Sequence, residues 1–150
     1  MNFSILDGHD IVYIARSSAP RFVSIGYQVG VRVPAHVVTP GRVILSSWTD
    51  ARLERWLAEH EFASFTAHTV TTAQSFHQEV LTARANDYWV TVQQLDLGLS
   101  GVAVAVKDRK GECLGAIGMT VQSATLSSES KIWSLLGPLR EAAQMLRAIL

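Results

Sequence analysis

The side chains that most readily bind metals or act as nucleophiles, histidine and cysteine, are few in this sequence. The five histidines are His9, His36, His60, His68 and His77. A helical zinc site needs two histidines four residues apart with a carboxylate at matching spacing, and no pair meets that requirement on a convincing helix. The single Cys113 lies in a strand-like run, where a thiol is usually a small buried hydrophobe. We therefore interpret these residues as structural, and expect no metal site, no cofactor and no catalytic residue.

Glycines recur in the second half of the chain, at Gly98, Gly101, Gly111, Gly115 and Gly118. They match neither a phosphate-binding loop nor a dinucleotide fingerprint, because no helix opens after them. Glycine within a strand allows another group to approach the sheet closely. The pattern therefore indicates space against the sheet.

The triplet Thr39-Pro40-Gly41 is typical of a helix start, with Thr39 as the N-cap and Pro40 at the first helical position. Free N–H groups at a helix start attract a carboxylate, and Gly41 would let a ligand approach them. An ordinary helix cap is the alternative interpretation.

Three further residues could contact a ligand. Trp89 shares a strand face with Thr91 and Gln93 by alternation and could line a pocket. Arg16 follows an apolar strand and Arg32 lies between two valines, so either could meet an anion. Solvated arginine at a strand end is the commoner role.

Strand-like and helix-like runs that would position these residues alternate along the whole chain. Strands are expected at 3–6, 11–15, 22–25, 88–93, 101–106 and 113–121, the first two joined through an Asp-Gly turn. Helices are expected at 39 to about 48, from 49 or 50, at 73–85 and from 127 or 128 onward, the last kinked or split at Gly137-Pro138. A surface loop is expected at 62–72. An antiparallel sheet with helices packed on its faces, an α/β (α+β) fold, would bury the apolar faces of these helices and strands.

Composition limits the function further. The chain has 150 residues, with 13 basic and 13 acidic side chains scattered singly. This suits one domain without a basic stripe for nucleic acid. A lone cysteine fits a reducing cytoplasm, and no signal peptide or membrane span is evident. The 48% hydrophobic content favours a subunit interface or an apolar pocket.

Four blocks of the chain, taken in order, are LDGHDIVYIARSS, VSIGYQVGVRVPAHVVTPGRVILS, ANDYWVTVQQLDLGLSGVAVAVKDRKGECLGAIGMT and LGPLREAAQMLRAIL. Together they resemble the effector-binding domain of the isocitrate-lyase-regulator (IclR) family of bacterial transcription factors. The run from Val92 to Leu99 looks closest to regulators that respond to protocatechuate or 4-hydroxybenzoate. The resemblance implies that residues 1–150 are one GAF-like domain that binds a small acid and forms a homo-dimer or tetramer. It also implies that DNA is bound only through an N-terminal winged helix-turn-helix, which is absent from this chain.

The resemblance also implies a site. Members that bind keto acids hold the carboxylate at the helix start, here Thr39, Pro40 and Gly41, and with strand residues, here Thr91, Gly101, Gly118 and Thr120. Glycine at 101 and 118 is expected to enlarge the cavity, so that Gly118→Leu would fill it and leave the fold intact.

The enlarged cavity would suit the ring of an aromatic acid. That ring would lie against Tyr13, Tyr27, Ala103 or Trp89, and its hydroxyl would bond Gln93, Thr91 or His36. A stand-alone GAF-like signalling module is the alternative function, and a small hydrolase or metalloenzyme is a distant third.

Overall fold

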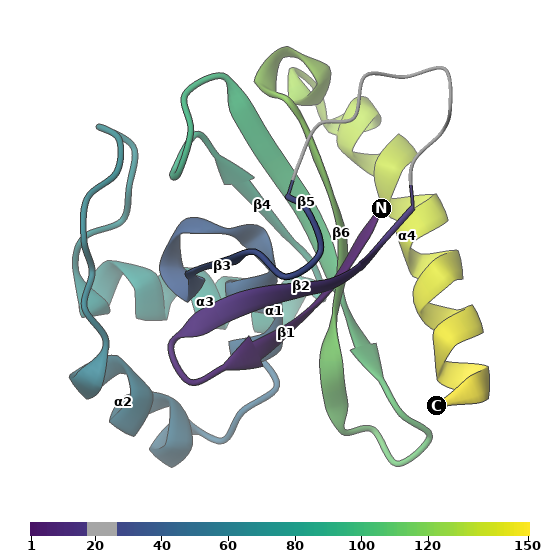
Figure 1. The fold of residues 1–150 in the computed structure, drawn as a ribbon, viewed down its shortest axis with the longest axis horizontal. Coiled ribbons are helices and arrows are strands. Elements are labelled where there is room, and N and C mark those ends of the chain that lie inside the picture. Colours follow the sequence, from purple (N-terminus) through teal and green to yellow (C-terminus); the bar gives the residue numbers. More distant parts are fainter. Residues whose placement is uncertain (18–26) are drawn as a thin grey trace.

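A six-stranded antiparallel sheet with the order β3-β2-β1-β6-β5-β4 forms the middle of the fold (Figure 1). The computed structural model describes residues 1–17 and 27–150, and the strand expected at 22–25 lies outside them. The strands are β1 Asn2–Asp7, β2 Asp10–Arg16, β3 Arg32–Pro34, β4 Trp89–Val92, β5 Leu99–Lys107 and β6 Cys113–Gln122. Pairing of β1 with β6 joins the N-terminal hairpin to the C-terminal strands.

Helices cover both faces of the sheet, as the sequence predicts. They are α1 Thr39–Leu45, α2 Asp50–Glu59, α3 Ala73–Asn86 and α4 Glu129–Ile149, with short 3-10 helices η1 Ala35–Val37 and η2 Ser123–Leu126. Helix α1 lies on one face with α3 and α2 outside it, and α4 lies along the other face (Figure 1). The antiparallel α/β architecture is therefore confirmed.

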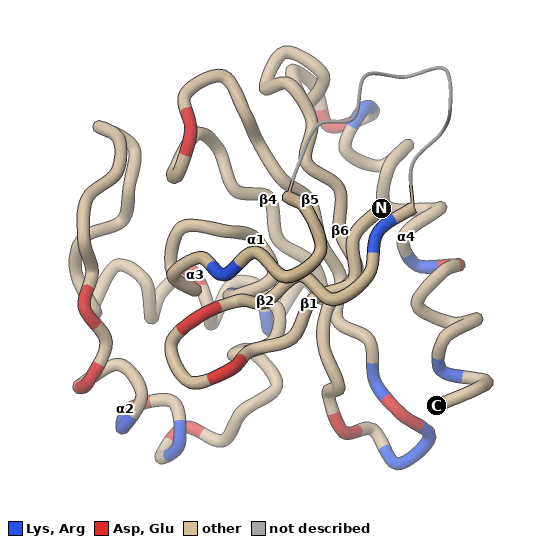
Figure 2. Tube along the Cα trace, viewed as in Figure 1, with Lys and Arg blue, Asp and Glu red and all other residues tan. Residues whose placement is uncertain are grey.

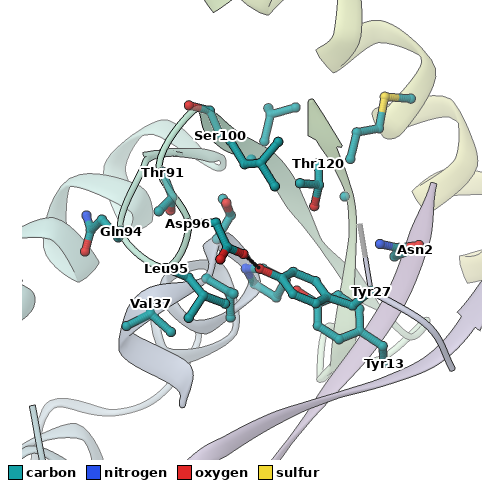
Figure 3. Close-up of a pocket in the computed structure, with 18 residues that line it drawn as sticks. Asn2, Tyr13, Tyr27, Val37, Thr91, Gln94, Leu95, Asp96, Ser100 and Thr120 are labelled. Atoms are coloured by element: carbon teal, nitrogen blue, oxygen red, sulfur yellow. Dashed lines mark hydrogen bonds between the residues drawn. The ribbon is translucent and has the colours of Figure 1, made fainter. Parts of the chain in front are cut away.

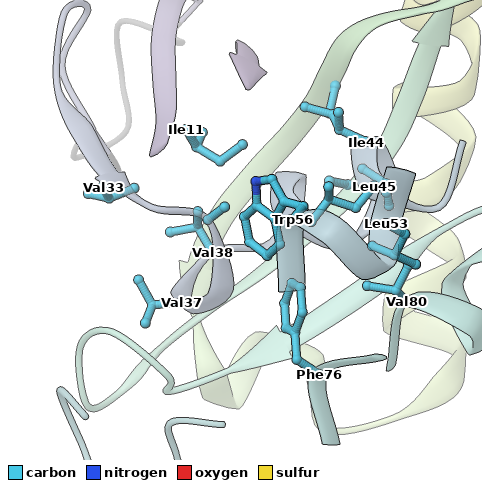
Figure 4. Close-up of a cluster of buried hydrophobic side chains, with 14 of the residues drawn as sticks. Ile11, Val33, Val37, Val38, Ile44, Leu45, Leu53, Trp56, Phe76 and Val80 are labelled. Atoms are coloured by element: carbon cyan, nitrogen blue, oxygen red, sulfur yellow. The ribbon is translucent and has the colours of Figure 1, made fainter. Parts of the chain in front are cut away.

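Alternation along the strands divides the core into two clusters. Ala103 and Ala116 face the α1 side, where Leu53, Trp56 and Phe76 of α2 and α3 are buried (Figure 4). The next residues along the strands face α4 and pack on Leu136 and Leu139, which are fully buried. Since neighbouring strand residues point to opposite faces, one strand supplies both clusters.

The helix starts agree with the sequence for α2 and α3 but not for α1. Thr49 and Thr72 accept hydrogen bonds from the backbone N–H groups of Arg52 and Ser75, as N-caps do. The predicted N-cap Thr39 is instead the first residue of α1, and Val38 is the cap, without a side-chain bond. The reason is tertiary, because the Thr39 side chain lies over the sheet.

Helix α1 also ends at Leu45, earlier than predicted. The hydroxyls of Ser46 and Ser47 donate to the carbonyls of Val43 and Ile44 at 2.7 and 2.6 Å. Serine that bonds the backbone of the preceding turn competes with helix continuation.

Helix α4 runs from Glu129 to Ile149 without a break, so of the two expected effects of Gly137-Pro138, a kink or a split, the split is wrong. Proline removes the bond to the carbonyl four residues earlier, here that of Ser134. Ser134 is exposed, so water can satisfy this carbonyl. Burial of Leu136 and Leu139 on either side holds the helix to the sheet.

Charged residues lie mostly at the periphery of the molecule (Figure 2). Basic and acidic residues of the β5–β6 turn lie near the C-terminus, where Arg109 donates to the Ala148 carbonyl at 2.7 Å. Among the described residues, no helix is both long and apolar enough to cross a membrane.

Candidate functional site

A cavity of about 40 Å³ lies between the start of α1, the β4–β5 loop and the α1-facing side of the sheet (Figure 3). Its lining includes Tyr13 of β2, Tyr27, Thr39 and Pro40 of α1, Thr91 of β4, Gly101 of β5, and Gly118 and Thr120 of β6. The predicted helix start and the predicted strand positions therefore meet at one place.

Strand register explains why these residues meet. Thr91 pairs with Gly101, and Gly101 pairs with Thr120, so the three form a row across β4, β5 and β6. Paired residues of antiparallel strands project from the same face. Thr91 is only 5% exposed, and its hydroxyl has no hydrogen-bond partner among the described residues. A buried hydroxyl without a partner costs about 1–3 kcal/mol, so a ligand group that bonds it would recover that cost.

The glycines do not enlarge the cavity as the sequence suggested. A Cβ atom at position 101 would lie 2.3 Å from Thr39 Oγ1, so the Thr39 side chain occupies the space that the glycine leaves. At position 118, a Cβ atom would lie 2.8 Å from the Val102 carbonyl oxygen and 3.1 Å from Ala103 Cβ. Gly118→Leu would therefore disturb the strand pair, and it is not a clean test of ligand binding.

We expect Gly101→Ala to destabilise the domain by about 1–3 kcal/mol, because the added methyl overlaps Thr39 Oγ1. Thr39→Ala in the same chain should restore most of the loss, since the Thr39 Cβ would remain 3.4 Å away. Thermal unfolding of the two single variants and the double variant measures the coupling. Additive effects would show that the two side chains do not compete for this space.

Gly41 has a different role from the one predicted. A Cβ atom there would lie 2.0 Å from the Ala35 carbonyl oxygen, so glycine allows α1 to pack against η1. Its backbone N–H already donates to the Val38 carbonyl at 3.3 Å. Gly41 is therefore used within the fold and lies outside the cavity lining.

The loop at 93–98 supplies lining residues that sequence reasoning did not find. Gln93 has a left-handed backbone (φ 53°), and its side-chain oxygen accepts from the Gly98 N–H at 2.7 Å. Thr66 and Thr69 donate to the carbonyls of Gln93 and Gln94, each at 2.6 Å. The loop at 62–72 thus holds the β4–β5 loop over the sheet.

Arg42 orients Gln94, which lines the cavity. The Gln94 side-chain oxygen accepts from Arg42 Nη2 at 2.9 Å and from the Val70 N–H at 3.1 Å. Both partners are donors, so the oxygen must face them, and the Gln94 NH₂ group is left to donate elsewhere. Arg42 itself is fully buried and pairs with Glu79 at 2.6 Å.

Tyr13, Tyr27 and Asp96 lie close together in the lining of the cavity (Figure 3). The tyrosine rings stack with centroids 4.9 Å apart, and the Tyr27 hydroxyl donates to Asp96 Oδ2 at 3.4 Å. Burial raises the pKa of Tyr13, with a smaller contribution from Tyr27. Burial and the nearby Asp96 carboxylate raise the pKa of Tyr27. Both phenols are therefore neutral hydrogen-bonding groups at physiological pH.

Residues 1–148 match the model of the family described as bacterial transcriptional regulator IclR C-terminal. The chain belongs to the IclR C-terminal domain family. This confirms the resemblance of its four sequence blocks. The Pca regulon regulatory protein of Pseudomonas putida is 32% identical over 120 residues, covering 79% of this chain and 41% of the relative.

Two further relatives combine sequence and structural similarity. The p-hydroxybenzoate hydroxylase transcriptional activator of Acinetobacter baylyi is 30% identical over 154 residues, covering 98% of this chain and 57% of the relative. The chain is also similar in structure to a double mutant of the PobR inducer-binding domain from Acinetobacter, which was solved as a complex with 3-hydroxybenzoic acid. That structure has a TM-score of 0.90 and 27% identity, covering 99% of this chain and 87% of its own. The chain spans about half the length of the two sequence relatives.

Several of the predicted site residues lie outside the lining of the cavity in this IclR C-terminal domain. They are Arg16, Arg32, His36, Gly41, Trp89, Gln93 and Ala103. Arg32 pairs with Asp7 at 2.9 Å beside the β1–β2 turn, and Arg16 donates to the Tyr27 carbonyl at 3.4 Å.

His36 and Ala103 are buried outside the lining, and Trp89 is half-buried there. His36 contacts His60 and the Ala63 carbonyl, each at 2.8 Å. Ala103 and Trp89 pack in the α1-side core. The indole N–H of Trp89 has no partner among the described residues. Trp89 and Thr91 do lie on the same face of β4, as the alternation predicts, but only Thr91 lines the cavity.

Sequence reasoning missed more than half of the lining. These residues are Asn2, Val37, Val38, Gln94, Leu95, Asp96, Leu99, Ser100, Val102 and Met119. Asn2 could be found only through the register, because it pairs with Gly118 across β1 and β6. Gln94 and Asp96 lie in a loop without a periodic pattern, so the sequence carries no signal for their direction.

Proposed function

We propose that this domain senses a small aromatic acid, 4-hydroxybenzoate first and protocatechuate next, as the effector-binding part of a bacterial transcription regulator. The unpartnered, buried hydroxyl of Thr91 carries this proposal, because it lines a cavity that also holds a stacked tyrosine pair. Apolar and aromatic walls with a few fixed polar groups are typical of small-molecule sites. The relatives named for the Pca regulon and for p-hydroxybenzoate hydroxylase support the choice of ligand class.

The polar groups of the cavity differ in what they can bond. Thr91 and the NH₂ group of Gln94 can donate hydrogen bonds to a carboxylate, and Figure 3 shows them on the same side of the cavity. Asp96 accepts only and repels a carboxylate, so it suits a ring hydroxyl. We therefore propose that the carboxylate lies near Thr91 and Gln94 and the hydroxyl near Asp96, with the ring against Tyr13 and Tyr27.

The size of the cavity requires a rearrangement on binding. About 40 Å³ holds only two or three water molecules, and a benzoate ring needs more room. The 3.4 Å contact between Tyr27 and Asp96 is long for a hydroxyl–carboxylate hydrogen bond, and Asp96 is exposed. We propose that these two side chains move apart to admit the ligand.

Calorimetric titration of related compounds tests the ligand class. We expect 4-hydroxybenzoate to bind more tightly than benzoate by about 1 kcal/mol, because benzoate cannot donate a hydrogen bond to the exposed Asp96 carboxylate. Benzamide should bind more weakly still, since it lacks the negative charge. Equal affinities for the three compounds, or tight binding of glyoxylate, would contradict the aromatic-acid assignment.

Thr91→Val tests the residue that carries the proposal. Valine keeps the shape of threonine and removes only the unpaired hydroxyl, so the unliganded domain should be as stable or slightly more stable. Its affinity for 4-hydroxybenzoate should fall about 10- to 100-fold, as expected for the loss of a hydrogen bond to a charged group. Thr82→Val, on the exposed side of α3, is the matched control and should bind normally. Unchanged affinity in Thr91→Val would place the ligand elsewhere.

The wider role follows from the family. We propose that DNA is bound by a winged helix-turn-helix segment outside this chain, that the domain catalyses no reaction, and that it works in the cytoplasm as a homo-dimer or tetramer. Exposed apolar side chains on α4, among them Trp133, Met145 and Ile149, support self-association.

A further inference from the structure

A larger hollow of about 390 Å³ lies away from the candidate site, and we call it the β5-edge groove. Its lining comes from α1, the end of α3, the last part of β5 and one stripe of α4. The residues are Val43, Ser46, Asp87, Val104, Ala105, Lys107, Arg140, Ala143, Gln144 and Arg147. None of them lines the effector cavity, and the volume is within the range of small-molecule sites.

Strand register leaves one side of β5 open at this groove. The β4–β5 ladder runs from Val92 opposite Ser100 to Trp89 opposite Ala103, where β4 begins. The Leu99 carbonyl accepts from the Gln93 N–H on the β4 side. Backbone groups six residues apart in a strand point the same way, so the Ala105 N–H and carbonyl also face that side. No strand among the described residues continues the ladder past Trp89, and a ligand could bond the Ala105 backbone.

The groove has excess positive charge. Lys107, Arg140 and Arg147 line it, against the single carboxylate of Asp87. Within the described part of the chain, none of these three cations has a carboxylate at ion-pair distance. Arg140 and Arg147 are seven residues apart on α4, and therefore lie on one face of the helix two turns apart. The groove can bring more than one positive charge to a ligand.

Packing holds the Arg140 side chain in place. Its guanidinium lies 5.3 Å from the centroid of the Trp133 ring and 5.9 Å from that of Tyr88. Cation–π contacts restrict the side chain without using its N–H groups. The floor between the cations is apolar, formed by Val43, Val104, Ala105 and Ala143.

We propose that the β5-edge groove is a second binding site, for a small organic dicarboxylate with an apolar body. Two carboxylates would match the excess of cations over Asp87, and the apolar body would cover the floor. The short free edge favours a small molecule over an added peptide strand, because β5 ends at Lys107, two residues after Ala105.

Phthalate is a suitable probe, since it joins two carboxylates to one ring. We expect its titration into the ¹⁵N-labelled chain, in about 150 mM salt to suppress weak surface attraction, to shift the amide signals of Ser46, Ala105, Lys107 and Gln144. Arg140→Gln and Arg147→Gln should each weaken binding about tenfold, as for loss of a charge-assisted hydrogen bond. Arg147 makes no ring contact with the residues that the structure describes, and it tests the charge if Arg140→Gln proves unstable.

Arg55→Gln is the matched control, because it makes the same change of charge on the exposed side of α2. It should leave phthalate binding unchanged. If Arg55→Gln weakens phthalate binding as much as the groove variants do, the binding reflects general charge attraction and the proposal is overturned. Shifts confined to the effector cavity, or unaltered affinity in both groove variants, would also overturn it.

Discussion

Arg42→Leu is expected to lower the free energy of unfolding by about 3 kcal/mol, because it removes a fully buried guanidinium and leaves the Glu79 carboxylate, which is 24% exposed, without its partner. Arg42 is fully buried, and its guanidinium donates to Glu79, to the Gln94 side chain and to the His36 carbonyl. Burial lowers the pKa of Arg42, while the Glu79 carboxylate opposes that shift. The site therefore depends on the pair as a unit.

Denaturant unfolding of Arg42→Leu and Arg84→Leu provides the comparison. Arg84 also bonds two carbonyls and a carboxylate, those of Ser46, Trp48 and Asp50, but it is 36% exposed and Asp50 is 74% exposed. Its loss should cost about 1 kcal/mol or less, as for surface pairs. If both variants lose the same free energy of unfolding, the burial of Arg42 does not make its contacts more stabilising than those of Arg84. Arg42→Leu should also weaken the binding of 4-hydroxybenzoate, because Arg42 no longer orients the Gln94 side chain.

The domain is expected to lose stability as the pH falls from about 6.5 to 4, because of a chain of three histidines. His60 contacts His9 through Nδ1 at 2.9 Å and His36 through Nε2 at 2.8 Å, and His36 Nε2 faces the Ala63 carbonyl at 2.8 Å. A carbonyl only accepts, so His36 Nε2 carries a proton, His60 Nε2 donates to His36, and His9 Nδ1 donates to His60. In this arrangement, a proton added to His60 or His36 places two donors face to face.

The sign of the pH effect follows from the pKa values. Burial first, then the neighbouring His36 and His9, lower the pKa of His60 to about 4 from 6.5. Burial also lowers the pKa of His36. Between pH 6.5 and about 4, the unfolded chain binds more protons than the folded chain, so protonation favours unfolding. The stability is fully present above pH 6.5 and is lost as the pH falls through the folded pKa.

Unfolding at a series of pH values measures this effect. The slope is at most about 1.4 kcal/mol per pH unit for each extra proton, and residual solvent contact of the rings reduces it further. His60→Phe keeps a ring on Trp56, whose centroid lies 4.2 Å from that of His60, and should flatten the profile. His68→Gln, at an exposed position, should leave the profile as it is. If the stability of His60→Phe falls as steeply with pH as that of the unchanged chain, groups other than His60 cause the loss of stability in acid.

The sequence alone determined the elements whose signals are local. The starts of α2 and α3 were predicted to within a residue, because capping and helical periodicity act within a few residues. Strand-like runs likewise located five of the six strands in the described part of the chain, and the order of the blocks identified the family. Family position then brought Thr39, Thr91, Gly101 and Thr120 to one cavity.

Only the tertiary structure decided how space and polar contacts are distributed. Gly101 looked like open space, but the residue that fills it, Thr39, is far away in the sequence. Nothing in the sequence singled out Arg42, because its burial depends on Glu79 and Gln94 from two other parts of the chain. Spacing along the chain gave no sign that His9, His36 and His60 meet, because contacts between separate elements follow from packing and register, which no local pattern encodes.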